Sequence, residues 1–373
     1  MNKLKIAIIG SRGYPYVYSG YETLVKELSE RIVKKGHNVR VYCHRSLFKI
    51  KPKNINGIEL VYTPSIKSKI FSQFFNSFFS FLHVCFSNVD VVLVVNSANG
   101  PFGLFTKIFK KKTCINVDGL EWLRPKWKGF GSIYFKFASK LSTILFDKII
   151  TDSKKMSDIY LEKFKSSSSV IAYGSTMINT NSIETLEKYN LKKDEFYLIV
   201  GRLIPDNNSK LIIESFIKSK SNKKLVVVGD VPYFDSYAKD VKNLNSNKII
   251  FTGYIKSQER LSELYSNCFG YIHGHEFGGT NPTMINALYF GCQVISLDTP
   301  FNREMLNRKK AIFFKKDILS ISKSIHEFEN RISELISLNK NYNFPTFYQW
   351  NKIVKKYIEV FYELLKSRQV SKF

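Results

Sequence analysis

The stretch KIAIIGSRGYP, residues 5–15, joins a short apolar run to a glycine-rich loop, and the chain repeats this pattern many times. Its first part, KIAIIG, predicts a buried strand, because a short apolar run that ends at a turn signal is typical of one. The next segment, GYETLVKELSERIVKKGH, predicts a helix, with an inner stripe of Leu24, Leu28, Ile32 and Val33 and an end at Gly36. NVRVYCH then predicts a second strand.

The alternation of strands and helices continues to about residue 152 and starts again after about residue 190. Apolar strands separated by helices predict parallel sheets that carry helices on both faces. We therefore expect an α/β fold with two doubly wound domains, a polar linker from about Thr176 to Asp194, and a long amphipathic helix at the end. The further strand-like runs are VDVVLVV, KTCINVD, KIITD, EFYLIVGRL, KLVVVGD, KIIFTGY, FGYIHGH and CQVISLD.

Length and composition narrow the class of protein. A chain of 373 residues is too long for one ordinary core, and 44% hydrophobic with 15% aromatic residues favours folding over disorder. The formal net charge of +26 suggests nucleic acid, an anionic membrane surface or phosphorylated ligands as partners. The lysines are spread along the chain, which argues against nucleic acid.

Cysteine usage and the apolar segments indicate a reducing compartment and no membrane span. The five cysteines form no C-x-x-C pair, so we interpret them as small buried hydrophobic residues. The apolar run near the N-terminus is too short for a signal peptide. The segment Ile70–Phe86 is interrupted by polar residues and falls short of the roughly 20 apolar residues that a bilayer span needs. It predicts a buried or interfacial helix.

Polar clusters follow the predicted strands where these end. They are GSRGYP (10–15), NVDGLEW (116–122), GRLIPDNNSK (201–210) and HGHEFGGTNPTMINAL (273–288). In open parallel sheets, ligands bind at the carboxyl ends of the strands. This coincidence predicts an active site that draws on both domains.

The segment GGTNP, residues 278–282, places small residues just before a helix with proline in its first turn. Free backbone N–H groups at a helix start suit an anion, especially a phosphate. A simple N-cap by Thr280 or Asn281 is the alternative. Arg202 could fork onto the same phosphate oxygens, or could instead pair with Asp206.

The remaining clusters are less specific. GSRGYP lacks the dinucleotide and Walker patterns, so its glycines serve either a close approach or a plain tight turn. Asp118 and Glu121 beside Trp122 suit sugar hydroxyls and ring faces, although Glu121 could simply pair with Arg124. His273 and His275 would need more ligands than Glu276 to hold a metal, so we expect none.

Taken together, GSRGYP, SGYETLVKEL, NVDGLEWLRPKW, TDS, GRLIPDNN and HGHEFGGTNP resemble the retaining GT-B glycosyltransferases. The resemblance is to the family 4-like subgroup with bacterial rhamnosyltransferases of surface-polysaccharide assembly, and it covers nearly the whole chain. It implies two Rossmann-like domains that face each other across a cleft. It places the acceptor-side domain at residues 1–178, the nucleotide-sugar domain at 179–345, and a helix that crosses back to the first domain at 346–373.

The resemblance also implies roles for particular residues. Catalytic roles fall to Asp118, Arg202 and Glu276, and acceptor contacts to Tyr21, Glu22, Glu121 and Trp122. Donor binding falls to Gly13, Arg202, Lys210, His275, Gly278, Gly279, Thr280, Asn281 and Asn286. No metal or cofactor is expected. Two positions depart from the superfamily: Asn286 stands where a glutamate usually contacts the donor ribose, and Asn207 stands where a lysine usually accompanies the arginine.

The expected function is transfer of a sugar to a lipid-linked glycan in O-antigen or capsule assembly. The preferred candidate for the sugar is L-rhamnose from dTDP-rhamnose. Transfer of another hexose or an N-acetylhexosamine from a UDP donor is the alternative. A basic nucleic-acid-binding protein is the non-enzyme alternative, and nucleic acid is not an expected partner. The enzyme would work in the cytoplasm, peripheral to the anionic inner face of the membrane. Ile70–Phe86 with Lys107, Lys110, Lys111 and Lys112 would supply the contact.

Overall fold

A computed structural model describes residues 3–15, 20–66, 71–124, 127, 129–231, 234–244 and 246–366. Ser19, Ile70, Pro125 and Lys126 of the segments discussed above lie outside these residues. The chain divides into two compact units. Unit 1 comprises Met1–Tyr173 and Phe347–Phe373, and unit 2 comprises Gly174–Thr346. The boundaries expected from the sequence were at residues 178 and 345.

Unit 1 is built on an eight-stranded sheet in the order β3-β4-β2-β1-β5-β6-β7-β8, parallel apart from the antiparallel pair β3–β4. The central strands β1 and β5 are almost completely buried, which explains why they have continuous apolar sequences. The strands are β1 (Lys5–Ile9), β2 (Asn38–His44), β3 (Asn54–Ile55), β4 (Ile58–Thr63), β5 (Val91–Val95), β6 (Lys112–Val117), β7 (Lys148–Thr151) and β8 (Ser169–Val170).

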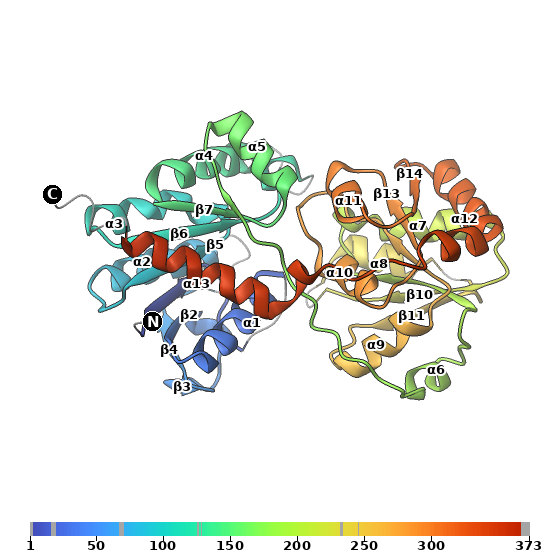
Figure 1. Ribbon diagram of the computed structural model, residues 1–373, viewed down its shortest axis with the longest axis horizontal. Helices are drawn as coiled ribbons and strands as arrows, with labels where there is room; N and C mark the ends of the chain where they lie inside the picture. The colour runs from blue at the N-terminus through green and yellow to red at the C-terminus, as the bar shows by residue number, and fades with distance from the viewer. Residues whose placement is uncertain are drawn as a thin grey trace. The chain divides into compact units, whose positions relative to one another are not determined.

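Helices cover both faces of this sheet (Figure 1). The chain builds the sheet from β1 toward β4 and later from β5 toward β8. Because crossovers between parallel strands are right-handed, this reversal puts α1 on one face and α2 to α5 on the other. In agreement, α1 packs on α13, while α3 packs on both α2 and α4. The helices are α1 (Gly20–Lys34), α2 (Phe71–Cys85), α3 (Gly103–Ile108), α4 (Phe130–Leu145), α5 (Lys154–Phe164) and α13 (Trp350–Lys366).

The last helix, α13, is part of unit 1 although it follows all of unit 2 in the sequence. It packs on α1 and on strands β5 and β6. Tyr357 is fully buried, and its hydroxyl accepts a hydrogen bond from Asn116 Nδ2 at 2.9 Å. The guanidinium of Arg31 lies 5.6 Å from the centre of the Trp350 ring.

Unit 2 has a six-stranded parallel sheet in the order β11-β10-β9-β12-β13-β14. Its core contains Tyr197, Phe216 and Phe328, all at most 1% exposed. The strands are β9 (Phe196–Val200), β10 (Lys224–Val228), β11 (Ile249–Gly253), β12 (Gly270–His273), β13 (Val294–Leu297) and β14 (Ile312–Phe314). The helices are α6 (Glu184–Lys188), α7 (Ser209–Ser219), α8 (Ser236–Lys242), α9 (Gln258–Asn267), α10 (Pro282–Tyr289), α11 (Pro300–Met305) and α12 (Ile318–Leu338).

Two sheets, one parallel and one parallel apart from β3, alternate with helices along the chain and confirm the predicted α/β class. The polar stretch 176–194 differs from the expected linker, because it contains α6, where Thr185 and Leu186 are buried. Leu186 N donates to the carboxylate of Glu263 in α9 at 2.8 Å, so tertiary contacts order a segment with little apolar pattern of its own. Within the described residues, no helix has both the length and the apolar composition required to cross a membrane.

Candidate functional site

Two loops of unit 2, which follow β9 and β12, are joined by a row of hydrogen bonds. Asn207 Oδ1 in the first loop lies 2.8 Å from His275 Nδ1 in the second, and Asn207 Nδ2 braces its own loop by donating to the Arg202 carbonyl at 2.7 Å. Asn208 Nδ2 donates to the Gly274 carbonyl at 2.8 Å, and the Glu276 amide donates to the Asp206 carbonyl at 3.0 Å. We call this pair of loops, residues 201–208 and 273–281, the joined loops.

Gly274 allows the joined loops to approach each other closely. A Cβ atom at this position would lie 2.4 Å from the Asn207 carbonyl oxygen and 2.6 Å from Ile212 Cδ1. No other residue fits there without moving the backbone. Asn302 of α11 supports the loop from the other side, donating from Nδ2 to the carbonyls of His275 and Leu297.

The charged residues predicted for this site lie around the joined loops. Arg202 is half-buried at the carboxyl end of β9. The carboxylate of Glu276 lies 2.6 Å from Lys316 Nζ, which neutralises it. Lys210, in the first turn of α7, has Nζ 4.0 Å from a carboxylate oxygen of Asp240, with both side chains well exposed. This loose pair would cost little to break.

The start of α10 has the shape predicted for GGTNP. Asn281 is the N-cap, and its Oδ1 accepts a hydrogen bond from Thr283 N at 3.0 Å, with Pro282 in the first turn. Gly278 has a φ of 129°, which a side chain would strain. Gly279 and Thr280 are buried. The N-cap alternative is therefore real, and the Asn281 amide itself donates to Met305 Sδ at 3.4 Å.

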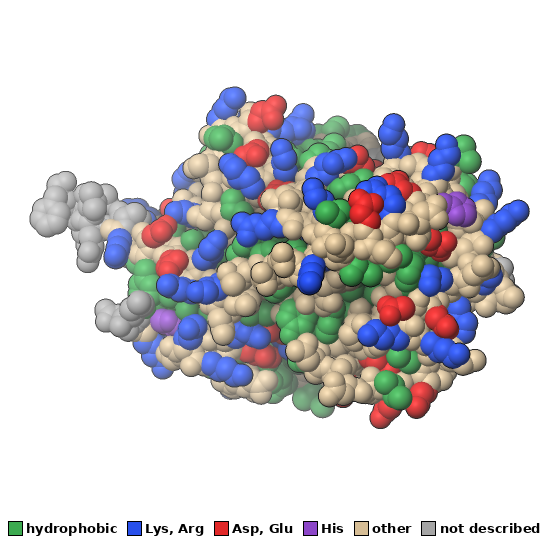
Figure 2. Space-filling model, turned by 45° about the vertical axis from the view of Figure 1, so that its right-hand side comes forward, with side chains coloured by type: hydrophobic (Ala, Val, Ile, Leu, Met, Phe, Trp, Pro, Cys, Tyr) green, Lys and Arg blue, Asp and Glu red, His purple; other side chains and the backbone are tan. Residues whose placement is uncertain are grey.

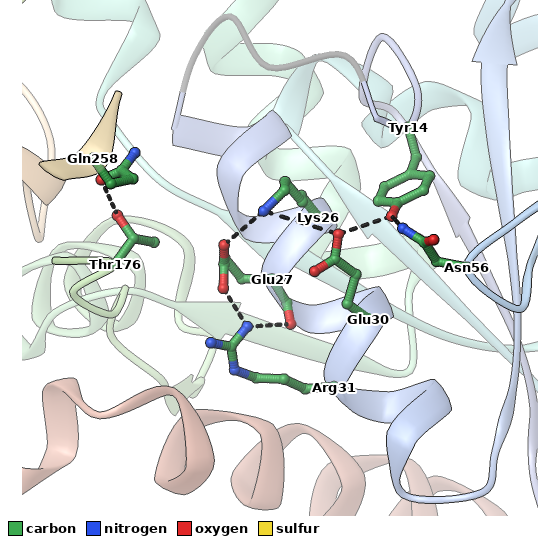
Figure 3. Close-up of polar contacts among 8 residues, drawn as sticks. All are labelled: Tyr14, Lys26, Glu27, Glu30, Arg31, Asn56, Thr176 and Gln258. Atoms are coloured by element: carbon green, nitrogen blue, oxygen red, sulfur yellow. Dashed lines mark hydrogen bonds and ion pairs between the residues drawn. The ribbon is translucent and has the colours of Figure 1, made fainter. Parts of the chain in front are cut away.

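The two positions that depart from the superfamily have partners inside unit 2. Asn207 holds the joined loops together, as described above. Asn286 is 7% exposed, and its Oδ1 accepts a hydrogen bond from Ser175 Oγ at 3.1 Å. Thr176, the residue after Ser175, donates from Oγ1 to the side chain of Gln258 in α9 at 3.3 Å (Figure 3). Each asparagine thus stabilises the backbone around the site.

His273 lies below the joined loops, at the end of β12. It is 3% exposed, and burial lowers the pKa of its imidazole to about 3. Its Nδ1 lies 3.2 Å from the Tyr271 hydroxyl, so it behaves as a neutral core side chain. Among the described residues, no three His, Cys, Asp or Glu side chains are arranged to hold a metal ion.

A pocket of about 540 Å³ lies at the carboxyl end of β11. The side chain of Tyr254 is 65% exposed there. The hydroxyl of Thr185 is buried and has no hydrogen-bond partner among the described residues. Three cationic side chains border the pocket, whose lining is Thr185, Lys188, Tyr189, Thr252, Tyr254, Ile255, Lys256, Ser257 and Arg260. It suits an anionic ligand with a flat ring.

In unit 1, Asp118 follows β6 and is hydrogen-bonded to two tyrosines. Its carboxylate accepts from the Tyr173 hydroxyl, and its backbone contacts the Tyr21 hydroxyl at 3.3 Å. Burial raises the pKa of Asp118 above the ordinary value for aspartate, and the two tyrosines oppose this rise. A carboxyl group held between hydroxyls in this way is suited to contact a sugar.

The loop GSRGYP is anchored on α1. The Arg12 amide donates to Glu22 Oε1 at 3.1 Å, and Glu22 is 3% exposed. The Tyr14 hydroxyl donates to Glu30 at 2.8 Å and accepts from Asn56, close to an ion-pair network of Lys26, Glu27, Glu30 and Arg31 (Figure 3). Gly13 has a φ of 119° and lies against Cys43, so a side chain there would clash. Here Glu22 shapes the loop.

Two predicted acceptor contacts have internal partners. Glu121 pairs with Arg124 Nε at 2.8 Å and also accepts from Trp127 Nε1 at 2.8 Å, which is the structural pairing considered from the sequence. Trp122 is 6% exposed, and its ring packs against Tyr160 and Phe164. Most of the Trp122 ring is therefore core surface, and its acceptor role stays a prediction.

Sequence reasoning missed four residues that shape these sites: Tyr173, Asn208, Gly274 and Asn302. Each acts through a partner distant in sequence, such as the 55 positions between Asp118 and Tyr173. The one sequence signal available was that Asn208 directly follows Asn207 in the segment NNSK, residues 207–210.

Charge is mixed on one face of the molecule. On the face shown in Figure 2, lysine and arginine side chains are interspersed with acidic ones and form no continuous stripe. A nucleic-acid-binding protein would be expected to gather its cations along one surface.

The chain matches two family models. Residues 181–344 match "Glycosyl transferases group 1", and residues 3–176 match "Domain of unknown function (DUF1972)". These two stretches correspond closely to the two units of the structure.

A curated relative and two solved structures are similar to the chain. The relative is N-acetylgalactosamine-N,N'-diacetylbacillosaminyl-diphospho-undecaprenol 4-alpha-N-acetylgalactosaminyltransferase of Campylobacter jejuni, 27% identical over 217 residues. This match covers 56% of the chain and 58% of the relative, so the chain spans less than two thirds of the relative's length. Sucrose-phosphate synthase from Thermosynechococcus elongatus has a TM-score of 0.82 at 15% identity, with 98% of this chain and 100% of that chain covered.

The Anabaena protein HepE, solved in complex with UDP and glucose, has a TM-score of 0.75 at 12% identity, with 96% of this chain and 100% of that chain covered. At these identities the structures show the fold. Residues 181–344 therefore match the glycosyl transferases group 1 family, and the two Rossmann-like units have the fold of the GT-B glycosyltransferases.

Proposed function

We propose that the protein transfers a hexosyl group from a nucleotide-sugar donor to a lipid-linked glycan. The observation that carries the proposal is the group 1 glycosyltransferase match of residues 181–344, which include the joined loops with Arg202 and the start of α10. Both loops follow the carboxyl ends of parallel strands, where such folds bind ligands.

The donor diphosphate would bind between Arg202 and the amides of Gly278 to Asn281. As the bond from the sugar to the diphosphate breaks, negative charge grows on the leaving phosphate oxygens. A guanidinium and oriented amides stabilise that charge more than they stabilise the intact donor, and this difference accelerates transfer. Lys210 could add a second cation, because its pair with Asp240 is loose. Transfer should therefore persist in the presence of EDTA.

The nucleoside would extend along the sheet edge toward the pocket at the end of β11. That strand lies three positions from β12 in the sheet, or about 14 Å at the usual spacing of parallel strands. The exposed ring of Tyr254 offers a stacking surface for a base.

The identity of the sugar is the finer part of the proposal. The sequence favours L-rhamnose from dTDP-rhamnose. The similarity to an N-acetylgalactosaminyltransferase acting on a diphospho-undecaprenol acceptor favours an N-acetylhexosamine from a UDP donor as the second candidate. Both donors carry the same diphosphate, so Arg202 and α10 serve either one. We expect retention of the anomeric configuration, and NMR of the first-formed product would report it.

The acceptor and the location follow from the same similarity. An acceptor on a lipid diphosphate places the reaction at a membrane surface, so we expect a peripheral enzyme on the cytoplasmic side. Asp118, with Tyr21 and Tyr173, is our predicted sugar contact in unit 1.

A panel of nucleotide sugars tests the proposal. dTDP-rhamnose, UDP-N-acetylgalactosamine and UDP-glucose are each scored for thermal stabilisation and for slow donor hydrolysis. Arg202→Ala removes a charge-assisted contact worth about 1.5–3 kcal/mol, so the rate with the preferred donor should fall by about one to two decades. A folded Arg202→Ala variant with the wild-type rate would show that the diphosphate binds elsewhere. Stabilisation by none of the donors would reject the proposed function.

A further inference from the structure

Helix α2 buries several polar side chains and exposes several of its phenylalanines, although Phe81 is buried. Asn76, Ser77 and Ser80 are fully buried. Asn76 Nδ2 donates to Thr63 Oγ1 at 2.7 Å, and Ser77 Oγ donates to Asn99 at 2.6 Å. On the opposite side, Phe71 and Phe75 are 58% and 40% exposed. A surface helix of a water-soluble domain normally has the reverse arrangement.

Helix α4 carries a second apolar stripe on its outer side. At about 100° per residue, Phe130, Ile133, Phe137 and Ile144 fall within a sector of about 60°. Their exposed fractions are 92%, 66%, 54% and 50%. The core of unit 1 is contacted by the opposite side, where Phe135 and Ala138 are buried. The outer stripe therefore has no partner in the described part of unit 1.

Helix α3 lies between these two helices and joins their outer surfaces. Phe109, just after α3, contacts Phe86, just after α2, with ring centres 5.0 Å apart. Lys107 Nζ donates to the carbonyl of Ile144 at the end of α4 at 2.8 Å. The exposed side chains of α2, α3 and α4 thus form one surface on one side of the unit 1 sheet, which we call the α2–α4 face.

The charges of this face have a single sign. Helices α2, α3 and α4 contain no aspartate or glutamate, whereas α1 contains Glu22, Glu27 and Glu30. Lys136 and Lys140 are exposed on α4, and Lys140 lies just beside the apolar stripe. Lysine stems lying along an apolar surface keep their ammonium groups at its rim.

We propose that the α2–α4 face docks onto an anionic lipid bilayer, with α2 and α4 lying in its interface. The inference gains its biological reason from the lipid-linked acceptor of the proposed function, but it rests on exposure and charge in unit 1. Helices of 15 and 16 residues extend about 23–24 Å and cannot span about 30 Å of hydrocarbon, but they can lie flat in the interface.

A second copy of the chain is a poorer occupant. A symmetric contact would bring Lys107, Lys136 and Lys140 against the same lysines of the other copy, without carboxylates to offset them. An anionic bilayer instead offers phosphate groups to the lysines and acyl chains to the phenylalanines.

Vesicle flotation tests the docking. Wild-type protein is mixed with phosphatidylcholine vesicles with or without phosphatidylglycerol. The variant Ile133→Glu/Phe137→Glu places two acids in the exposed stripe of α4, where folding should tolerate them. Leu319→Glu/Ile336→Glu is the matched control, because these residues are 69% and 55% exposed on α12 of unit 2. Circular dichroism checks the fold of each protein.

We expect the wild type and the control to float with the anionic vesicles, and the α4 variant to lose about tenfold or more in binding. Vesicle binding by Lys136→Glu/Lys140→Glu should fall by about fivefold or more for each lysine replaced. This second variant tests the proposal if the α4 variant misfolds. Wild type that stays unbound at low salt, or an α4 variant that binds as well as the control, would overturn the proposal. The proposal would also be overturned if the wild type formed a dimer and did not bind vesicles, and the α4 variant were a monomer.

Donor hydrolysis is measured on the same proteins. Because the substitutions lie outside the joined loops, hydrolysis should be equal in all of them. Loss of flotation with intact hydrolysis separates docking from the chemistry. Flotation without hydrolysis in any protein would leave docking standing and reject the proposed function.

Discussion

Replacing Asn207 by alanine should separate the joined loops of unit 2. Its side chain makes one bond between the loops, from Oδ1 to His275 Nδ1 at 2.8 Å, and one within its own loop, from Nδ2 to the Arg202 carbonyl at 2.7 Å. Alanine keeps the backbone and removes both bonds. The remaining connections are those of Asn208 with Gly274 and of Asp206 with Glu276.

The expected cost follows from these two bonds. A hydrogen bond contributes about 0.5–1.5 kcal/mol net, so the free energy of unfolding should fall by about 1–3 kcal/mol. If half of this is needed to order the loops again when the donor binds, affinity for the nucleoside diphosphate should fall by about two- to tenfold. The change is smaller than for Arg202→Ala, because no charge next to the phosphates is removed.

Urea denaturation and calorimetric titration measure the two effects. The nucleoside diphosphate is the one that stabilises the wild type most. Asn307→Ala, at an exposed position of the same unit, is the control and should change neither quantity. Unaltered stability and affinity in Asn207→Ala would refute the bridging role. Lower stability with unaltered affinity would show that the joined loops do not form the donor site.

Three further outcomes are expected. Gly274→Ala puts a Cβ 2.4 Å from the Asn207 carbonyl oxygen and should cost about 1–3 kcal/mol in thermal unfolding, whereas Gly20→Ala, with open space around it, should be neutral. Burial lowers the pKa of His44 from 6.5 to about 4, so its contribution to stability is present above pH 6.5 and is lost as the pH falls toward 4. That loss amounts to about 3 kcal/mol, and in His44→Gln the urea midpoint should change less with pH over this range. Tyr173→Phe removes the hydroxyl that bonds Asp118 and should cost about 1.5–3 kcal/mol in urea denaturation, and a variant as stable as wild type would contradict that bond.

The sequence alone determined the α/β class and most of the strands. Runs such as VVLVV and FYLIV are apolar throughout because both faces of a parallel strand are covered, and this signal is local. The start of α10 was also predictable, because proline and an N-cap asparagine act on neighbouring backbone atoms. The stretch 201–210 was recognised as polar and placed after a strand for the same reason.

Tertiary structure decided which residues those local signals bring together. The sequence contains no sign that Asn207 bonds His275, that Tyr173 bonds Asp118, or that Gly274 must be small, because each partner arrives from another strand or loop. The same holds for α2, whose apolar run predicted a buried or an interfacial helix equally well. Only the packing shows that Asn76, Ser77 and Ser80 face the core, where they bond Thr63 and Asn99. The exposed phenylalanines of the same helix are Phe71, Phe74 and Phe75.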